Sequence, residues 1–333
     1  MRIRTLLRGL PALLAAGVMM SACGVSADDK TSGGADAGPL KGLRILVPNS
    51  PGSGYDTTAR AAAKAMQDAK LTDTVEVFNT AGAGGTVGLQ RLVNEKGKED
   101  LLMQMGLGVV GAVYTNKSKA TLTDTTPIAK LIEESEAIVV PKGSPYTTLD
   151  QLVAAWKADP GKVPVGGASN PGGPDHLTPM LLAKAVGITP KDVNYVAYDG
   201  GGELLTGVLG KKVAFAATGI GEVAEQAKSG DVKILAVTSA ERVAAVDAPT
   251  LKEQGVDLEF SNWRGIVAPP GVSDAKKQEF IDLLSKMHDS AQWKQTLQTQ
   301  GWTDSFQTGD EFKTFLDQEN TRVAGVLGEL GLA

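Results

Sequence analysis

The sequence predicts an α/β protein of two domains that are joined by paired crossing strands, with a ligand cleft between the domains. Three observations indicate this fold. Strand-like apolar runs alternate with helical runs along most of the chain, a pattern typical of parallel strands covered by helices. The alternation is interrupted at "AIVVPKGSPYTTLDQL" and again at "NWRGIVAPPGV". Several strands lead into helices through glycine-rich loops, and such loops gather where open α/β sheets bind ligands.

The N-terminal segment predicts an exported protein with a lipid anchor. Residues 1–22 combine three arginines, an apolar run and small residues, which is the pattern of a signal peptide. Cys23 follows directly, as the lipidated cysteine does in a bacterial lipobox; an ordinary signal peptide with an incidental cysteine is the alternative. Residues 23–41 are small and polar and predict a flexible tether. We expect Cys23 to hold the protein at the cell membrane, on its extracytoplasmic (periplasmic or outer) face.

The composition argues against several functional classes. The chain has 33 basic and 38 acidic residues, a net charge of −5, and loss of residues 1–22 changes this charge to −8. An acidic chain with 5% aromatic residues is a poor candidate for nucleic-acid binding. A single cysteine excludes a disulfide framework, and two histidines cannot form a His-based metal cluster. We therefore expect no metal, no cofactor and no nucleic-acid partner.

The predicted elements fall into two series. The first series has strands at 44–48, 75–79, 100–105, 128–132 and 137–141, with helices at 55–69 and 86–95. The second has strands at 163–167, 193–198, 212–218 and 232–238, with helices at 177–186, 203–209 and 222–228, and two long helices at 274–299 and 310–330 end the chain. The two interruptions predict one discontinuous domain of residues 42–139 plus 264–333 and a second domain of residues 140–263.

Two neighbouring loops of the first domain predict an anion site. "PNSPGSGYDTT" and "NTAGAGGTVG" each join a strand to the start of a helix. Free backbone N–H groups at a helix N-terminus attract anions, and glycines allow a ligand to approach closely. The structural alternative is that Ser53 and Asp56 form a capping box and that the glycines only serve the turns. Two such loops side by side favour a carboxylate ligand.

No catalytic motif accompanies these loops. The second domain has two more strand-to-helix loops, "GGASNPGGPDH" and "YDGGGE", and His176 is interpreted as a first-turn or packing residue rather than a catalyst. "GLGVVG" matches a dinucleotide-binding pattern, but that pattern needs a long helix directly after its glycines, and a loop is expected beyond Tyr114. A G-x-S-x-G elbow is missing from the sequence. The sequence therefore predicts a binding protein, and a secreted hydrolase is the unsupported rival.

Taken in order, these loops resemble the extracytoplasmic solute receptors of tripartite tricarboxylate transporters, the TctC or Bug family. The resemblance covers nearly the whole chain after the N-terminal segment. It rests on "VPNSPGSGYDTTAR", "NTAGAGGTVG", "YDGGGELLTGVLGKKV", "ILAVTSAER", "PTLKEQG" and "NWRGIVAPPGV". It implies a two-lobe periplasmic-binding-protein fold of type II-like topology that closes on a small carboxylated solute. It also implies a sodium- or proton-coupled membrane transporter as partner, and no enzymatic activity.

The resemblance also implies which residues bind the solute. The predicted contacts of the first domain are Ser53, Gly54, Tyr55, Asp56, Thr57, Ala83, Gly84, Gly85 and Thr86. Those of the facing domain are Ser169, Asn170, Asp175, Gly200, Gly201 and Gly202.

The sequence departs from the family pattern at two positions. Ser53 stands where glycine is usual, and Tyr55 stands where many members have threonine or serine. The aromatic residue at position 55 favours a tricarboxylate or dicarboxylate such as citrate as the ligand. Tyr55 could stack on the ligand, form a hydrogen bond with it or fill the first helical turn. Arg264 is interpreted as a hinge or surface residue, with a second ligand carboxylate as the alternative. Two further alternatives are a sensor of the same fold and a receptor for an aromatic or amino acid.

Overall fold

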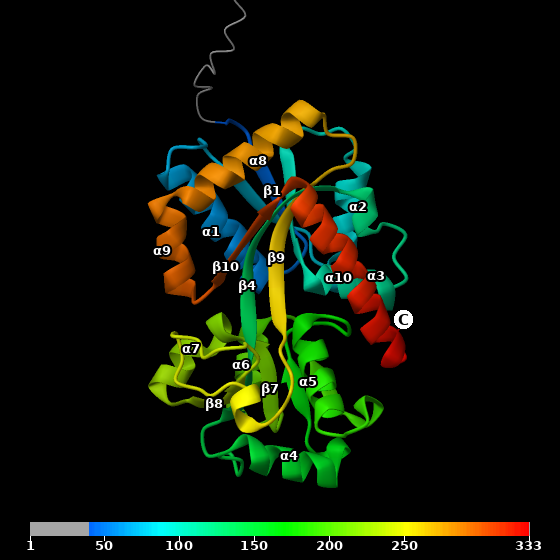
Figure 1. Ribbon diagram of the computed structural model, residues 1–333, viewed down its shortest axis with the longest axis vertical. Coiled ribbons are helices and arrows are strands. Elements are labelled where there is room, and N and C mark those ends of the chain that lie inside the picture. The colour runs from blue at the N-terminus through cyan, green and yellow to red at the C-terminus, as the bar shows by residue number, and fades with distance from the viewer. Residues whose placement is uncertain (1–39, 333) are drawn as a thin grey trace, which may run out of the picture. The chain divides into compact units, whose positions relative to one another are not determined.

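The computed structural model describes residues 40–332. The predicted signal peptide, Cys23 and nearly all of the predicted tether therefore lie outside the described residues. The described chain folds into two α/β lobes that share one mixed sheet with the strand order β2-β1-β3-β9-β4-β7-β5-β6, and β8 and β10 also pair with β4 (Figure 1).

The larger lobe contains the first strands and the end of the chain. β1 (Arg44–Val47) pairs in parallel with β2 (Glu76–Asn79) and β3 (Leu101–Gly106), whereas β9 (Ser261–Ala268) runs antiparallel to β3, and β10 (Thr303–Thr308) antiparallel to β4. The helices of this lobe are α1 (Gly54–Asp68), α2 (Thr86–Asn94), α3 (Leu107–Thr115), α8 (Asp274–Asp289), α9 (Ala291–Gln300) and α10 (Gly309–Glu329). Trp263, Trp293 and Phe280 are among the large side chains fully buried in its core.

The smaller lobe is built around β5 (Val165–Gly167), which pairs in parallel with β6 (Tyr195–Ala197) and β7 (Phe215–Gly219). β8 (Val232–Val237) is antiparallel to β4. Its helices are α4 (Leu149–Ala158), α5 (Pro174–Ala185), α6 (Gly201–Leu209) and α7 (Ile220–Ser229). Two apolar clusters fill the lobe, one around Trp156 and Phe215 and the other around Leu204 and Val208.

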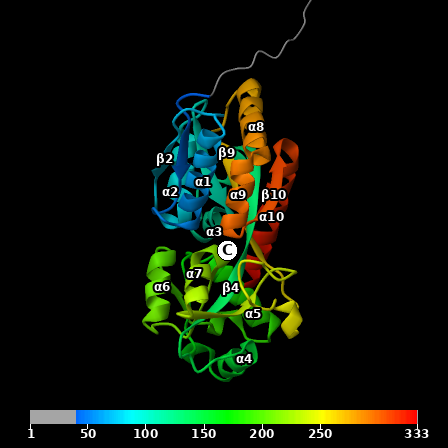
Figure 2. The same ribbon diagram turned by 90° about the vertical axis from the view of Figure 1, so that its left-hand side faces the viewer.

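One long strand connects the lobes. β4 (Thr126–Pro141) is continuous over 16 residues, although the sequence predicts two separate strands here. It pairs with β9 as far as Ser135 and with β7 from Glu136 onward, so it changes partner where it leaves one lobe for the other (Figure 2). The paired crossing strands of the predicted fold are thus β4 and β9, while the domain boundaries at 139/140 and 263/264 stay a prediction.

Three other elements differ from expectation. The predicted helix 274–299 is divided at Ser290, whose hydroxyl accepts a hydrogen bond from the Trp293 N–H and caps α9. β10 has the sequence TDSFQT, which lacks the apolar alternation of a strand. No helix was expected at 107–115, where α3 begins at Leu107 and is apolar on nearly all sides, as suits a buried helix; the loop expected beyond Tyr114 follows its end at Thr115.

The glycines of "GLGVVG" serve packing. A Cβ atom at Gly106 or Gly108 would lie 2.9 Å from the ring or hydroxyl of Tyr55. A Cβ atom at Gly111 would collide with the carbonyl group of Gly172, which belongs to the other lobe. The Thr115 hydroxyl donates a hydrogen bond to the Pro171 carbonyl 3.2 Å away at the same contact. Gly111 therefore permits α3 to touch the smaller lobe.

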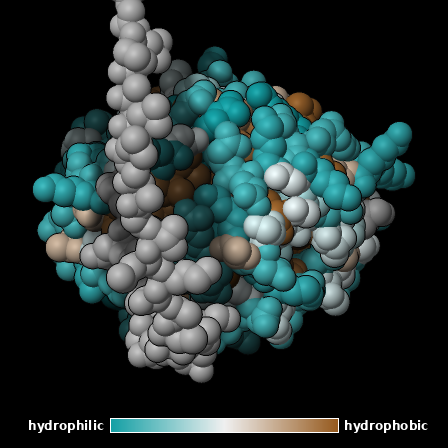
Figure 3. Space-filling model, turned by 90° about the horizontal axis from the view of Figure 1, so that it is seen from above, coloured by the Kyte–Doolittle hydropathy of each residue, from teal (hydrophilic) through white to brown (hydrophobic). Residues whose placement is uncertain are grey.

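The described surface is mainly hydrophilic where it is seen from the end that carries α8 (Figure 3). Across residues 40–332, the helices are all too short or too polar to cross a membrane.

We expect Gly111→Ala to hold the lobes further apart, because the new methyl group has no room against Gly172. Alanine has a higher helix propensity than glycine, so the substitution by itself should stabilise α3 by about 1 kcal/mol. A larger radius of gyration would therefore not result from unfolding of this helix. Small-angle X-ray scattering of the purified protein should show a larger radius of gyration. Gly325→Ala in α10, where a Cβ atom meets nothing within 4 Å, is the control. Identical scattering from both variants would contradict the predicted contact.

Candidate ligand-binding cleft

A cleft of about 380 Å³ lies between the lobes, at the ends of β1, β2, β3, β5 and β6. Ten of the predicted contact residues line it: Ser53, Gly54, Tyr55, Ala83, Gly84, Ser169, Asn170, Asp175, Gly200 and Gly201. Asp56, Thr57, Gly85, Thr86 and Gly202 do not line it. The structure thus brings the four predicted loops together, and direct contact of these residues with a ligand stays a prediction.

Asp56 holds the first loop in shape through hydrogen bonds, although its side chain does not line the cleft. Its carboxylate accepts hydrogen bonds from the Gly52 N–H at 2.9 Å, from Asn79 Nδ2 at 3.0 Å and from Arg60 Nε at 2.9 Å. Burial alone would raise the pKa of Asp56, but these hydrogen bonds, above all that of Arg60, outweigh it and lower the pKa. The Asp56 N–H points back to Ser53 Oγ, 3.4 Å away, which caps α1. Asp56 is therefore a positioning residue.

The second loop has an unusual backbone. Gly82, Ala83, Gly84 and Gly85 have positive φ angles in succession, of 137°, 47°, 63° and 99°. A Cβ atom at Gly84 would lie 2.7 Å from the Ala112 methyl group, so the loop packs directly on α3. Glycine is thus required here both by φ and by space. The turn η1 (Ala83–Gly85) leads straight into α2, which begins at the same edge of the sheet as α1 because β1 and β2 are parallel.

Tyr55 is buried beneath the cleft. Its hydroxyl accepts a hydrogen bond from the Val109 N–H at the start of α3, at 3.3 Å. Burial raises the pKa of Tyr55 to about 12, so the phenol stays neutral at physiological pH. Of the three roles left open by the sequence, the structure supports packing in the first turn of α1, with one edge of the residue reaching the cleft.

The facing lobe presents the loop before α5. Asp175 is buried and accepts hydrogen bonds from the Ala168 N–H at 2.8 Å and from Ser169 Oγ at 2.9 Å. Its pKa is raised by burial. His176 lies in the first turn of α5, where Nδ1 accepts from the Gly172 N–H at 3.2 Å and the ring meets that of Tyr195 edge to face. Burial lowers the pKa of His176 to about 4, so the imidazole is neutral. Its position is that of a packing residue.

The sequence indicated Arg264 as a hinge or surface residue but did not single out Asn262 or Glu222. Asn262 and Arg264 of β9 and Glu222 of α7 all line the cleft. Arg264 is buried, and it donates through Nη2 to Glu134 of β4 at 2.7 Å and through Nη1 to Thr58 at 3.2 Å. It is therefore a buried hinge residue and not a surface one. The signal that could have placed it is strand alternation, because Asn262 and Arg264 share one face of β9.

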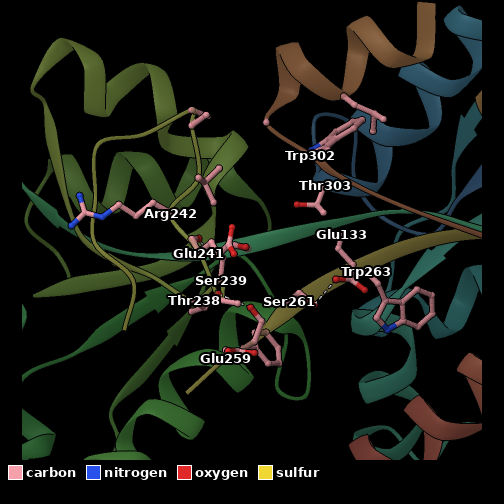
Figure 4. Close-up of a pocket in the computed structure, with 18 of the residues that line it drawn as sticks. Glu133, Thr238, Ser239, Glu241, Arg242, Glu259, Ser261, Trp263, Trp302 and Thr303 are labelled. Atoms are coloured by element: carbon pink, nitrogen blue, oxygen red, sulfur yellow. Dashed lines mark hydrogen bonds between the residues drawn. The ribbon is translucent and has the colours of Figure 1, made fainter. Parts of the chain in front are cut away.

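The other face of the crossing strands borders a second, larger hollow of about 980 Å³ (Figure 4). Glu133, Ser261, Trp263 and Trp302 line it, and it shares no lining residue with the cleft. Two of its carboxylates are already engaged: Glu133 binds Lys130, Ser261 and Ser305, and Glu319 binds Trp263 Nε1 and Arg322. The predicted loops open only into the cleft, so the cleft is the candidate site.

Comparison with known proteins identifies the family. The family model described as the tripartite tricarboxylate transporter family receptor matches residues 58–332. The chain belongs to this receptor family. The resemblance noted in the sequence is thereby confirmed, and the family consists of solute-binding receptors.

Individual relatives agree with this assignment. The receptor is 29% identical to protein BugT of Bordetella pertussis, over 95% of this chain and 96% of that protein. Its fold is similar to that of the periplasmic binding protein BugD, with a TM-score of 0.79, 24% identity and coverage of 88% of this chain and 99% of BugD. MatC from Rhodopseudomonas palustris, solved with bound malate, gives a TM-score of 0.77 at 23% identity, over 87% of this chain and 99% of MatC. The two-lobe periplasmic-binding-protein fold is thus confirmed.

The floor of the cleft in this receptor is rich in acidic groups. Glu134, Glu136, Asp175 and Glu222 surround Arg264 closely enough for their charges to affect one another. Burial, reinforced by the charges of Asp175 and Glu134, raises the pKa of Glu222 to about 7. Burial likewise raises the pKa of Glu136 well above its usual range. In the part of the chain that the structure describes, no set of three or more His, Cys, Asp or Glu side chains is arranged to hold a metal ion.

The raised pKa of Glu222 predicts a pH-dependent stability. The usual pKa is 4.5 and the folded value about 7, so between these values the folded receptor binds more protons than the unfolded chain. Its free energy of unfolding therefore falls as the pH rises through this window. We expect Glu222→Gln to remove this fall in stability. The thermal midpoint of the variant, relative to that of the unmodified receptor, should therefore rise by a few degrees between pH 5 and pH 8.

The matched control for this measurement is Glu225→Gln, which changes an exposed carboxylate one turn further along α7. Differential scanning fluorimetry over the pH series compares the three proteins. A difference between Glu222→Gln and the unmodified receptor that does not vary with pH would contradict the burial of this charge.

Proposed function

We propose that this receptor captures a small carboxylated solute in the interlobe cleft and delivers it to a secondary transporter of the tripartite tricarboxylate type. The observation that carries the proposal is the convergence of two helix-starting loops, from β1 to α1 and from β2 to α2, on one cleft. Free backbone N–H groups and the positive ends of two helix dipoles would then attract the carboxylate to the same space. The lobes would close on the solute by bending at β4 and β9, between a domain of residues 42–139 plus 264–333 and one of residues 140–263.

The chemistry of the cleft fits reversible capture. The side chains that line the cleft from the larger lobe's loops are small or neutral, so the ligand carboxylate would meet dipoles and no fixed cation there. A cleft of about 380 Å³ is at the lower end of the size of small-molecule sites. MatC, of similar fold, is a protein with bound malate, which supports a dicarboxylate-sized ligand here. The Tyr55 hydroxyl oxygen accepts a hydrogen bond from the Val109 N–H, and the preference for citrate that Tyr55 suggested in the sequence stays a prediction.

The sequence supports two further parts of the proposal. Cys23 would carry the lipid anchor and hold the receptor on the extracytoplasmic face of the cell membrane, where the solute is met. The family assignment favours a binding role without catalysis, and His176, the histidine nearest the cleft loops, is buried and neutral.

Removing the Asp56 carboxylate tests the proposed site. Asp56→Ala leaves Gly52, Arg60 and Asn79 without their shared acceptor, so the first loop should lose its fixed shape. We expect affinity for the bound carboxylate to fall more than tenfold, measured by isothermal titration calorimetry after a thermal-shift screen of di- and tricarboxylates, aromatic acids, amino acids and sugars. A ligand at 100 times its dissociation constant stabilises by about 2.7 kcal/mol, which such a screen detects.

Asp68→Ala is the control, because Asp68 lies near the end of the same helix in an exposed ion pair with Lys64. It should leave affinity unchanged. Wild-type affinity in a folded Asp56→Ala protein would reject the loop as the site, and a screen in which only neutral sugars bind would reject the carboxylate proposal itself.

A further inference from the structure

The two sides of the cleft differ in polarity. The larger lobe contributes the helix-starting loops with their backbone donors. The hinge and the smaller lobe contribute acceptors: Asp175 and Glu222 line the cleft, and Glu134 and Glu136 lie next to them. A Cβ atom at Gly201 would collide with the Glu222 carboxylate, so glycine keeps this carboxylate uncovered. A ligand that is anionic at both ends matches only one side of this cleft.

The carboxylates also outnumber the cations. Among the described residues that line the cleft, Arg264 is the one basic side chain, and it is paired with Glu134 at 2.7 Å. Asp175 and Glu222 are held by neutral donors, the Ala168 N–H, Ser169 Oγ and Thr218 Oγ1. Buried carboxylates are stable when a cation or several hydrogen-bond donors accompany them. The floor of the cleft therefore has more acidic groups than basic ones.

An unpartnered acceptor gives an independent indication. Asn262 is 4% exposed and lines the cleft, and its Oδ1 atom has no hydrogen-bond partner among residues 40–332. A buried acceptor left unpaired is destabilising, so a hydrogen-bond donor from the ligand would remove this penalty. A metal ion does not suit this position, because the described carboxylates are not arranged as a metal site. An N–H donor with a positive charge suits both Asn262 and the acidic floor.

We propose that the solute carries a protonated amino group, which binds Glu222, Asp175 and Asn262 while its carboxylate meets the loops of the larger lobe. The receptor would then select an amino-bearing carboxylate over a simple dicarboxylate or tricarboxylate. This inference rests on the proposed function, which supplies the carboxylate end. The alternative is a ligand with a second carboxylate that binds Arg264 Nε. This atom is also buried without a partner among the described residues.

Matched pairs of ligands separate these occupants. Isothermal titration calorimetry compares aspartate with succinate, glutamate with glutarate, alanine with propionate, 4-aminobutyrate with butyrate and phenylalanine with 3-phenylpropionate. In each pair the carbon skeleton is the same and only the amino group differs. We expect at least one amino compound to bind at least tenfold more tightly than its partner. Glu222→Gln should reduce this preference at least tenfold, and the exposed control Glu225→Gln should retain it.

Each result decides the matter. If simple acids bind and no amino compound binds more tightly than its partner, the inference is wrong and the proposed function stands. If no carboxylate of any pair binds, both are wrong. A preference for an amino compound that survives in a folded Glu222→Gln protein overturns the assignment to Glu222. Because the pairs are first compared in the unmodified receptor, the inference is decided even if a variant does not fold.

Discussion

The buried ion pair between Arg264 and Glu134 is the interaction on which the hinge depends. Arg264 also binds Thr58 of α1 in the larger lobe, and Glu134 accepts from the Gly221 N–H of α7 in the smaller lobe at 2.9 Å. One chain of hydrogen bonds thus crosses from lobe to lobe through the two strands. Burying two charges is costly unless both are well paired. Glycine at 221 is needed because a Cβ atom there would lie 2.8 Å from Glu134.

The alternation of side chains along the crossing strands separates two environments. Asn262 and Arg264 face the cleft, whereas Ser261 and Trp263 face the second hollow. On the hollow's side, the carboxylates of Glu133 and Glu319 are satisfied by cations and other donors from this chain. On the cleft's side, acidic groups remain in excess. On one face of these strands the carboxylates of Glu133 and Glu319 therefore have their hydrogen-bond partners within the chain. On the other face some polar groups lack partners, and a ligand can supply them.

Local patterns predicted most of the fold, while the site was predicted only in part. The βα alternation and the loop glycines are signals within about ten residues, and they placed Ser53, Gly84 and Asn170 at the cleft. The role of Asp56 was not visible, because a carboxylate that faces a ligand and one that braces a loop look alike in sequence. Glu222 was not found, and Arg264 was recognised only as a hinge or surface residue, because its partner Glu134 is brought to it by strand pairing between segments more than 100 residues apart. α3 was not predicted as a helix, because its glycines, which disfavour helix, are required by close contacts with Tyr55 and Gly172.

The single 16-residue strand β4 also determines the order in which the lobes can be completed. Every strand pair of the smaller lobe lies within residues 136–237, so its sheet needs nothing from the last quarter of the chain. The larger lobe has no continuous sheet until β9 arrives from Ser261 onward and joins β3 to β4. Pairing across such sequence distances makes folding slow. The lobe that begins the chain is thus the last to be completed, and the inserted lobe already contains the C-terminal part of β4, the strand with which β9 must pair.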